Sequence, residues 1–246
     1  ELGKIVQPAV PIHASPNLFF ADLAEIRLTE SGSRAEWCAQ VRAQRQAAFA
    51  APKQPGDLDM GEVMSWLQRH LPDDVIITNG AGNFAIWPNK HFSFGARARL
   101  LAPQSGSMGY GLPAAIAAKI AEPERRVVCF AGDGDIQMHI GELGTAMQEQ
   151  AQPIVLVVNN GMYGTIRMHQ ERQHPGRVSG THLENPDFVT LGQAYGFHAE
   201  RIEHTDEFAP AFERALDSPT GALLELVVPA EMLTPTLSIS EARGSA

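Results

Sequence analysis

Apolar runs and stretches with helical spacing alternate along most of the chain. Apolar runs that end in turn residues predict strands over 75–79, 126–132, 153–160, 198–202 and 222–228. Apolar residues spaced three and four apart predict helices over 60–71, 108–121, 140–150, 187–196 and 207–218. Several of these strands are apolar throughout, as is typical of a parallel sheet covered on both faces. The pattern therefore predicts an α/β fold with three layers: a doubly wound, mostly parallel sheet between two layers of helices.

The first 55 residues follow a different pattern. Residues 4–12 predict a strand, and residues 18–28 and 31–50 predict helices. The prolines and glycine in APKQPGD mark a boundary. We interpret residues 1–55 as the tail of a preceding domain plus a linker, 56–232 as one domain, and 233–246 as a C-terminal tail, frayed from residue 238. The chain has no initiator methionine, so we expect it to be a fragment or a processed product.

Composition and charge argue against a disordered chain and against a nucleic-acid-binding protein. Of the 246 residues, 44% are hydrophobic and 19% are charged, which is typical of a globular chain rather than a disordered one. The net charge of −9 argues against a nucleic-acid partner. The small basic pairs Arg97 with Arg99 and Arg125 with Arg126 are interpreted as solvated loops.

The cysteines bear on the redox state of the compartment, and the hydropathy pattern bears on membrane insertion. Cys38 and Cys129 belong to no metal or disulfide motif, and Cys129 lies inside an apolar run, so we expect a buried thiol and a reducing, cytoplasmic environment. No apolar stretch reaches about 18 residues, so we expect no membrane-spanning helix.

Small residues that carry oxygen atoms follow three predicted strands, at residues 79–83, 132–135 and 159–161. In an open α/β sheet, ligands bind beyond the carboxyl ends of the strands. Glycines allow the backbone to approach a ligand, and carboxylate and amide oxygens suit Mg²⁺ that also holds phosphate. Each cluster alone is also compatible with an ordinary turn, and the chain contains neither a complete dinucleotide fingerprint nor a P-loop. Together the clusters indicate a magnesium diphosphate held between neighbouring strand ends.

The combination of motifs resembles the thiamine-diphosphate-dependent enzymes. GDG at 132–134, then 24 residues, then Asn159-Asn160 is similar to that family's cofactor motif. Residues 105–115, SGSMGYGLPAA, resemble the G-x-M-G-x-G-L-P-A-A segment of the acetolactate synthase group, and residues 160–164 resemble the stretch after its metal site. The resemblance covers about residues 57–230, and residues 1–30 are similar to the end of the family's central domain.

The resemblance implies roles for particular residues. Asp133, the side chain of Asn160 and the backbone carbonyl of Met162 would bind Mg²⁺. Met108 would hold the cofactor in a bent conformation, although without its flanking motif it would be interpreted as a core residue. The remaining cofactor-binding residues implied by the resemblance are Ala81, Gly82, Asn83, Gly106, Gly132, Gly134, Asp135, Gly164 and Thr165.

No catalytic residue can be assigned in this chain. In the family, a glutamate of the pyrimidine-binding domain drives cofactor activation, and that domain precedes this segment. His139 and Glu142 are interpreted either as residues that support the site through its ligands or as structural residues. His169, Glu171, Arg172 and His174 are predicted to form a polar, solvent-exposed loop after the last motif.

The resemblance implies decarboxylation of a small 2-oxo acid and carboligation to a second one, as in acetolactate synthases. Two departures leave the substrate open: Gly161-Met162 stands where Gln-His is typical, and His169 stands where a tryptophan is expected. The alternatives are a simple decarboxylase or another carboligase, such as a benzoylformate decarboxylase, and a non-catalytic Mg-diphosphate module. The resemblance also allows FAD in the whole protein, and it implies a homodimer or homotetramer whose sites form between subunits.

Overall fold

The computed structural model describes residues 2–27 and 32–244. The chain divides into two compact units, Glu1–Gln46 and Ala47–Ala246. The assignment of residues 1–55, 56–232 and 233–246 to domains stays a prediction.

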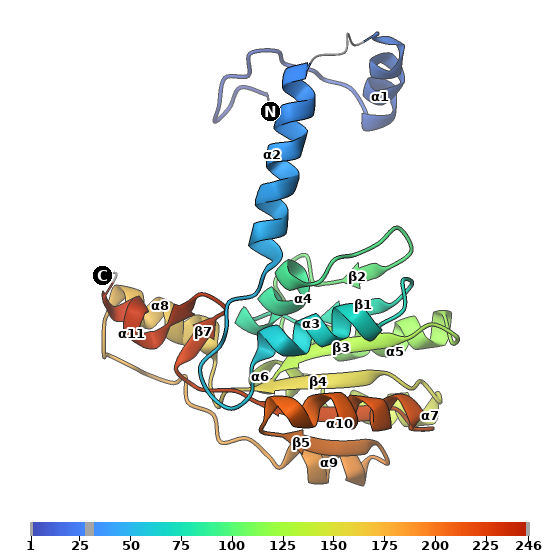
Figure 1. Cartoon of the computed structure of the whole chain (residues 1–246), viewed down its shortest axis with the longest axis vertical. Coiled ribbons are helices and arrows are strands. Elements are labelled where there is room, and N and C mark those ends of the chain that lie inside the picture. Colours follow the sequence, from blue (N-terminus) through green and yellow to red (C-terminus); the bar gives the residue numbers. More distant parts are fainter. Residues whose placement is uncertain (1, 28–31, 245–246) are drawn as a thin grey trace. The chain divides into compact units, whose positions relative to one another are not determined.

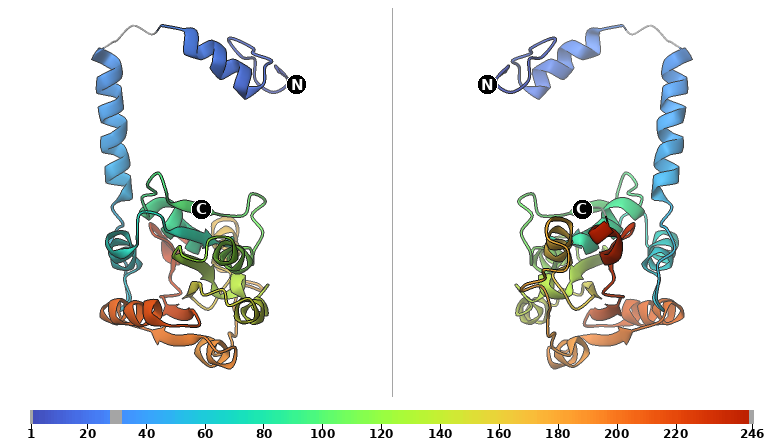
Figure 2. Two further views of the ribbon diagram at one scale, coloured as in Figure 1. Left: turned by 90° about the vertical axis from the view of Figure 1, so that its right-hand side faces the viewer. Right: turned by 90° about the vertical axis from the view of Figure 1, so that its left-hand side faces the viewer.

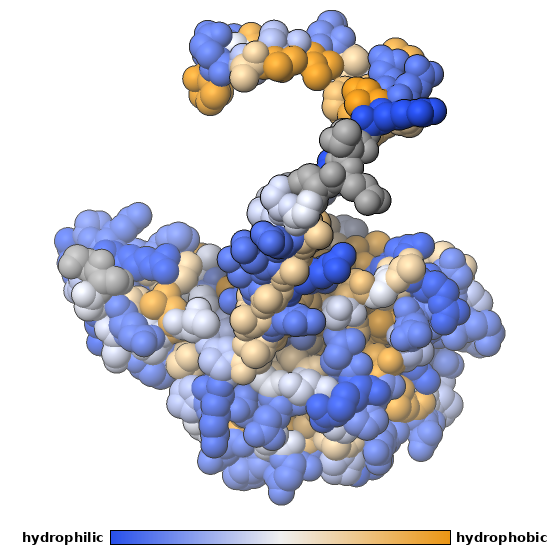
Figure 3. Space-filling view, turned by 45° about the horizontal axis from the view of Figure 1, so that its top comes forward, coloured by the Kyte–Doolittle hydropathy of each residue, from blue (hydrophilic) through white to orange (hydrophobic). Residues whose placement is uncertain are grey.

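The first unit contains helix α1 (Pro16–Glu25) and most of helix α2 (Gly32–Phe49). The Ser15 hydroxyl accepts a hydrogen bond from the Leu18 backbone N–H, and Pro16 occupies the first turn, as is usual at helix starts. Neither helix has a buried residue, and apolar side chains lie on the surface of this segment (Figure 3). Residues 28 and 31 of the two predicted helices lie outside the described residues.

The predicted strand over residues 4–12 is wrong. These residues form bends and irregular backbone. Pro8 and Pro11 lack the N–H groups that a ladder requires, and no described strand lies beside them to form one.

The second unit is built on a six-stranded parallel sheet of order β2-β1-β3-β4-β6-β5 (Figure 1). Its strands are β1 (Ile76–Asn79), β2 (Arg99–Leu101), β3 (Val127–Gly132), β4 (Ile154–Asn159), β5 (His198–Ile202) and β6 (Ala222–Val227). The predicted α/β fold is confirmed. The short strand β2 was not predicted.

Helices cover both faces of the sheet (Figure 2). The helices of the two layers are α3 (Met60–His70), α4 (Ile86–His91) and α10 (Thr205–Asp217) on one face, and α5 (Gly111–Ala121), α7 (Glu142–Gln148) and α9 (Phe188–Ala194) on the other. Alternate strand residues belong to opposite cores: Val128 packs with the first layer and Val127 with the second. Burial on both faces explains why β3 and β4 are apolar through most of their length.

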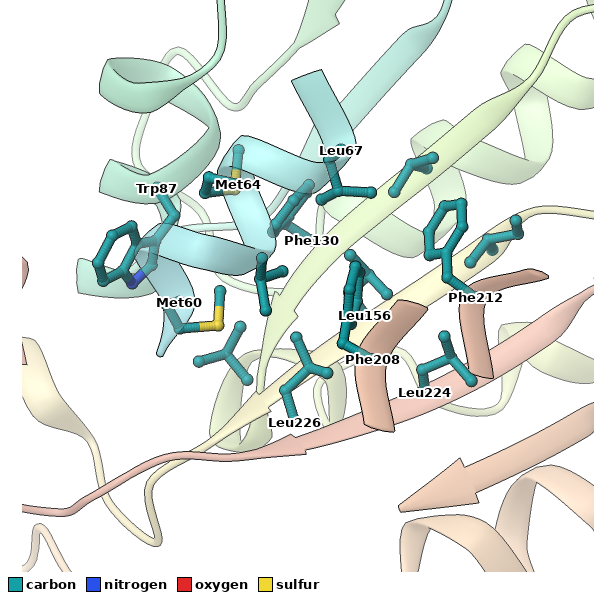
Figure 4. Close-up of a cluster of buried hydrophobic side chains, with 14 of the residues drawn as sticks. Met60, Met64, Leu67, Trp87, Phe130, Leu156, Phe208, Phe212, Leu224 and Leu226 are labelled. Carbon is teal, nitrogen blue, oxygen red and sulfur yellow. The ribbon is translucent and has the colours of Figure 1, made fainter. Parts of the chain in front are cut away.

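A cluster of buried apolar side chains lies under α3 and α10 (Figure 4). Aromatic rings of the two helices meet edge to face, with the Trp66 and Phe212 ring centroids 5.2 Å apart. The side chains that Figure 4 labels in this core come from two helices, from α4 and from three central strands: Met60, Met64, Leu67, Trp87, Phe130, Leu156, Phe208, Phe212, Leu224 and Leu226.

Helix α5 begins at Gly111, three residues later than predicted. Gly106 and Gly109 have φ values of +69° and +81°, in the left-handed region that favours glycine, so the chain turns before the helix starts. Two short helical turns follow strands of the sheet. The turn η1 (Asn83–Ala85) comes after β1, and α6 (Asp133–Ile136) comes directly after β3.

Two predictions about the polar and C-terminal segments are wrong. Residues 164–173, within the predicted polar loop, form helix α8 (Gly164–Gln173). The tail predicted to fray from residue 238 contains the end of β8 (Leu237–Ser238) and helix α11 (Ile239–Gly244), and it follows strand β7 (Met232–Thr234). Ile239 and Ala242 are buried with Met162 and Leu233 in a third apolar cluster. Residues 245 and 246 lie outside the described residues.

No helix in residues 2–27 or 32–244 is both long enough and apolar enough to cross a membrane.

Candidate functional site

A pocket of about 830 Å³, including its open mouth, lies where β1, β3 and β4 end. The segment before α3, the start of α8 and strand β7 complete its wall. All the predicted site residues except Gly106 line it: Ala81, Gly82, Asn83, Met108, Gly132, Asp133, Gly134, Asp135, Asn160, Met162, Gly164 and Thr165. The fold thus brings residues from distant parts of the chain to one place.

Asp133 follows β3 and is the first residue of α6. Its side chain is buried, with 2% exposed, and Oδ2 accepts a hydrogen bond of 2.8 Å from Asn185 Nδ2. Burial raises the pKa of the Asp133 carboxyl above its usual value, against the opposing hydrogen bonds from Asn185 and from backbone N–H groups. A cation in the pocket would favour the ionised carboxylate.

Asn160 and Met162 follow β4 in a turn. Asn160 Oδ1 accepts a hydrogen bond of 3.2 Å from the Met162 backbone N–H, and Gly161 between them has a φ of +69°. Met162 also pairs with His182 in an isolated bridge, which fixes the backbone of this turn. This ordered turn places Asn160 and Met162 in the pocket wall. Asp133, which follows β3, lies in the same wall.

The chemistry of this donor set fits Mg²⁺. The predicted set offers one carboxylate, one amide oxygen and one backbone carbonyl, which are hard oxygen ligands. Within the described residues, no group of three or more His, Cys, Asp or Glu side chains could hold a metal ion. The set therefore suits a cation that keeps other oxygen ligands, such as phosphate and water, and it does not suit zinc.

The charge of the pocket lining also favours a bound cation. Asp133 and Asp135 both line the pocket, whereas none of the described residues in that lining is lysine, arginine or histidine. Two carboxylates would repel a diphosphate, so an anionic ligand needs a cation to bind here.

The Asp135 carboxylate connects three turns around the pocket. Its Oδ1 accepts hydrogen bonds from the backbone N–H of Ala81 at 2.9 Å and of Gly109 at 2.8 Å, while Oδ2 has no hydrogen-bond partner within the described part of the chain. Burial raises the pKa of Asp135. The resemblance implied only that Asp135 binds the cofactor, and it did not indicate that its side chain holds these turns.

Two glycines are needed because aromatic rings lie against them. A Cβ on Gly134 would lie 2.4 Å from the Tyr163 ring, and a Cβ on Gly132 would lie 2.7 Å from the Phe84 ring. Tyr163 and Phe84 also line the pocket, so the rings hold the backbone of residues 132–134 in place.

Thr165 and Asn83 tie the start of α8 to the turn after β1. Thr165 Oγ1 donates a hydrogen bond of 2.9 Å to Asn83 Oδ1, and Asn83 Nδ2 contacts Met168 Sδ at 3.9 Å. Met108 lines the same pocket. Gly106 does not line it, and its predicted contact with the cofactor stays a prediction.

The residues interpreted as structural lie outside the pocket lining. The His139 ring Nδ1 is 3.1 Å from the Gly109 carbonyl oxygen, and Glu142 accepts a hydrogen bond from Thr145. His169, Arg172 and His174 are exposed, as predicted.

The prediction that Glu171 is solvent-exposed is wrong, because the side chain is fully buried. Its carboxylate accepts hydrogen bonds from Arg167, Arg243 and the Gly176 backbone N–H.

Several residues near the site were missed by the sequence analysis. Asn185 contacts Asp133, but an asparagine before a proline has no mark that distinguishes it from a turn residue. The apolar wall could not be foreseen either, because it combines segments far apart in sequence: Leu58, Met60, Phe84, Trp87, Val228, Met232 and Leu233.

The chain is similar to known proteins along most of its length. A family model described as "Thiamine pyrophosphate enzyme, C-terminal TPP binding domain" matches residues 80–226, which is more than half of the chain. The pocket residues that follow β1, β3 and β4 lie within or directly beside that match.

Three curated relatives are acetolactate synthase large subunits. The chain is 31% identical to that of Parasynechococcus marenigrum over 233 residues, covering 93% of this chain and 38% of the relative. It is 34% identical to that of Corynebacterium glutamicum, and the match covers 87% of this chain and 36% of the relative. It is 29% identical to the isozyme 2 large subunit of Escherichia coli, and the match covers 93% of this chain and 41% of the relative. The chain therefore spans about two fifths of the length of the curated relatives it matches.

Proposed function

The chain belongs to the thiamine pyrophosphate enzymes, and on that premise we propose that its pocket holds the diphosphate of thiamine diphosphate through one Mg²⁺ ion. The observation that carries the proposal is the pocket itself. It joins Asp133, Asn160 and Met162 at two neighbouring strand ends, and none of its described lining residues is basic. An anionic diphosphate is compatible with that lining only when a cation accompanies it.

The protein's contribution is to bind and orient the cofactor. Asp133, the Asn160 side chain and the Met162 carbonyl would hold Mg²⁺. The backbone of Gly134 and Asp135 and the turn from Ala81 to Asn83 would hold the diphosphate oxygens, with Asp135 keeping that turn in place. Met108 would support the bent cofactor, and the apolar wall would exclude water from it.

When bound, thiamine diphosphate supplies a carbon nucleophile and an electron sink for decarboxylation of a 2-oxo acid. No residue of this chain is assigned to the proton transfer that activates it. That role belongs, by family resemblance, to a glutamate of a pyrimidine-binding domain. We accordingly propose that the site is completed by such a domain of a neighbouring subunit in a homodimer or homotetramer.

For the whole protein we propose decarboxylation of pyruvate with transfer of the two-carbon unit to a second 2-oxo acid. The support is the similarity to acetolactate synthase large subunits along nearly all of this chain. We propose a cytoplasmic location because Cys38 and Cys129 are both free thiols, which fits a reducing compartment. FAD has no assigned residue in this chain.

A second candidate keeps the cofactor and changes the product. Gly161-Met162 and His169 differ from the residues expected in acetolactate synthases, and Met162 belongs to the pocket wall. These differences favour a simple decarboxylase or a carboligase that uses another acceptor.

Product analysis separates the two candidates. The whole protein is supplied with thiamine diphosphate, Mg²⁺ and ¹³C-labelled pyruvate, and the products are followed by NMR. We expect labelled acetolactate. Labelled acetaldehyde without any carboligation product would favour the decarboxylase, and turnover of pyruvate by the Asp133→Asn variant at the wild-type rate would contradict the proposed site.

A further inference from the structure

A chain of side-chain hydrogen bonds leads from Asp133 away from the pocket. Asn185, in the loop before α9, donates from Nδ2 to Asp133 Oδ2 at 2.8 Å and to Asn159 Oδ1 at 3.0 Å. Asn185 does not itself line the pocket, so it acts on a bound ligand only through Asp133 or the β4 end.

The orientation of the Asn185 amide is fixed from its other side. Gln137 Nε2 donates to Asn185 Oδ1 at 2.9 Å and to the Asp133 backbone carbonyl at 3.1 Å. With its oxygen occupied by a donor, Asn185 must present its NH₂ group to Asp133 and Asn159. The amide therefore has one orientation that satisfies all three contacts.

The chain continues into the sheet. Asn159 Nδ2 donates to Glu225 Oε1 at 2.7 Å, and Arg201 Nε donates to Glu225 Oε2 at 2.8 Å. Glu225 is 2% exposed and lies opposite Arg201 in the register of β5 and β6. Strands β4, β6 and β5 thus hold the Asn159 amide, which in turn limits where Asn185 can lie.

We propose that Asn185 is a positioning residue for the metal-binding carboxylate: it holds Asp133 Oδ2 so that the carboxylate has one orientation toward the pocket. The inference rests on the proposed function. A carboxylate that is free to rotate must lose that freedom when it binds a cation, and a fixed one has already lost it. Many metal ligands are held by a hydrogen bond from a second residue. Substituting that second residue typically weakens metal affinity by roughly 10–100-fold.

The test compares the Asn185→Ala and Glu184→Ala variants of the whole protein. The first substitution removes the amide without adding a charge, and the second removes an exposed side chain from the same loop. Thiamine diphosphate is held at a fixed concentration, and the Mg²⁺ concentration that gives half-maximal cofactor binding is measured by calorimetry. Mn²⁺ in place of Mg²⁺ gives an EPR line shape that reports the ligand geometry, and the thermal midpoint without metal reports folding.

We expect Asn185→Ala to raise the half-saturating Mg²⁺ concentration roughly 10–100-fold and to alter the Mn²⁺ line shape. Glu184→Ala should change neither. Gln137→Ala keeps Asn185 but removes the donor to its Oδ1, together with the hydrogen bond to the Asp133 backbone carbonyl. It should raise the Mg²⁺ requirement by less than Asn185→Ala does. Because residue 137 is exposed, this variant tests the inference without depending on how well Asn185→Ala folds.

Two results would overturn the inference, and they differ. If the wild-type protein binds the cofactor with Mg²⁺, and Asn185→Ala and Gln137→Ala both have the wild-type Mg²⁺ requirement, Asn185 does not position Asp133 and the proposed function stands. If cofactor binding by the wild-type protein does not depend on Mg²⁺, the proposed function and this inference both fail.

Discussion

The Glu171 carboxylate and the Arg243 guanidinium form a pair with two hydrogen bonds, Nε to Oε2 at 2.8 Å and Nη2 to Oε1 at 2.9 Å. Glu171 lies on α8 and Arg243 on α11 (Figure 1). The first residues of α8 and the strand β7 before α11 both line the pocket. The pair therefore joins two segments of the pocket wall, and the C-terminal helix belongs to the site's framework.

Removing the guanidinium should loosen the C-terminal helix. Arg243→Met keeps much of the side-chain length and should lower the Tm by a few degrees, because a charge-assisted pair to a buried carboxylate is lost. Arg172→Met removes an exposed guanidinium from α8 and is the control. Equal Tm values for the two variants would argue that the pair contributes nothing to stability.

The same carboxylate should give stability a specific dependence on acid. The hydrogen bonds from Arg243, together with that from the Gly176 N–H, lower the pKa of Glu171 from 4.5 to about 2. Because the folded pKa is the lower one, this stabilisation is fully present above about pH 4.5 and is lost as the pH falls toward 2. Urea unfolding from pH 6 to pH 3 should show a steeper loss in the wild type than in Glu171→Gln. Parallel curves would contradict the assignment.

The close contact between Gly134 and Tyr163 should make the GDG turn intolerant of a side chain. In Gly134→Ala, the new Cβ would lie 2.4 Å from the Tyr163 ring, so the ring or the turn must move. We expect a loss of roughly 1–3 kcal/mol in stability and at least about tenfold weaker binding of thiamine diphosphate. Gly141→Ala is the matched control, because nothing lies within 4 Å of its Cβ and its φ is −60°. Similar cofactor affinity in both variants would count against the tight fit.

Loss of the Asp135 carboxylate should free the turns that it holds. In Asp135→Ala, the backbone N–H groups of Ala81 and Gly109 lose their shared acceptor. Hydrogen exchange at these two amides should become at least about tenfold faster, because a 1.4 kcal/mol loss of protection corresponds to tenfold. The exposed Asp217→Ala should leave both amides unchanged. Unchanged protection in Asp135→Ala would show that the turns are held by other contacts.

The sheet and the strand-end clusters could be predicted because their signals are local. Each central strand is buried on both faces, as Val127 and Val128 illustrate, and such strands appear in sequence as short apolar runs. The parallel order then brings Asp133 and Asn160 together, because the strands that precede them, β3 and β4, are neighbours. The family motif added the roles that the residue types alone left open.

The rest depended on pairings between residues far apart in sequence. Glu171 and Arg243 are separated by 72 positions, and neither segment is apolar enough to indicate that it packs. Asn185 lies 52 positions from Asp133. The apparent strand over residues 4–12 failed for a related reason, since strand propensity requires a neighbouring strand to produce a ladder.

The most direct test of the account is titration calorimetry of the whole protein with thiamine diphosphate, with and without Mg²⁺, on the wild type and on Asp133→Asn. The substitution keeps the shape of the side chain and removes the negative charge that a divalent cation needs. We expect binding that requires Mg²⁺ in the wild type and is at least about tenfold weaker in the variant. Binding of equal strength in both proteins, with or without Mg²⁺, would contradict the claim that this pocket holds a magnesium diphosphate.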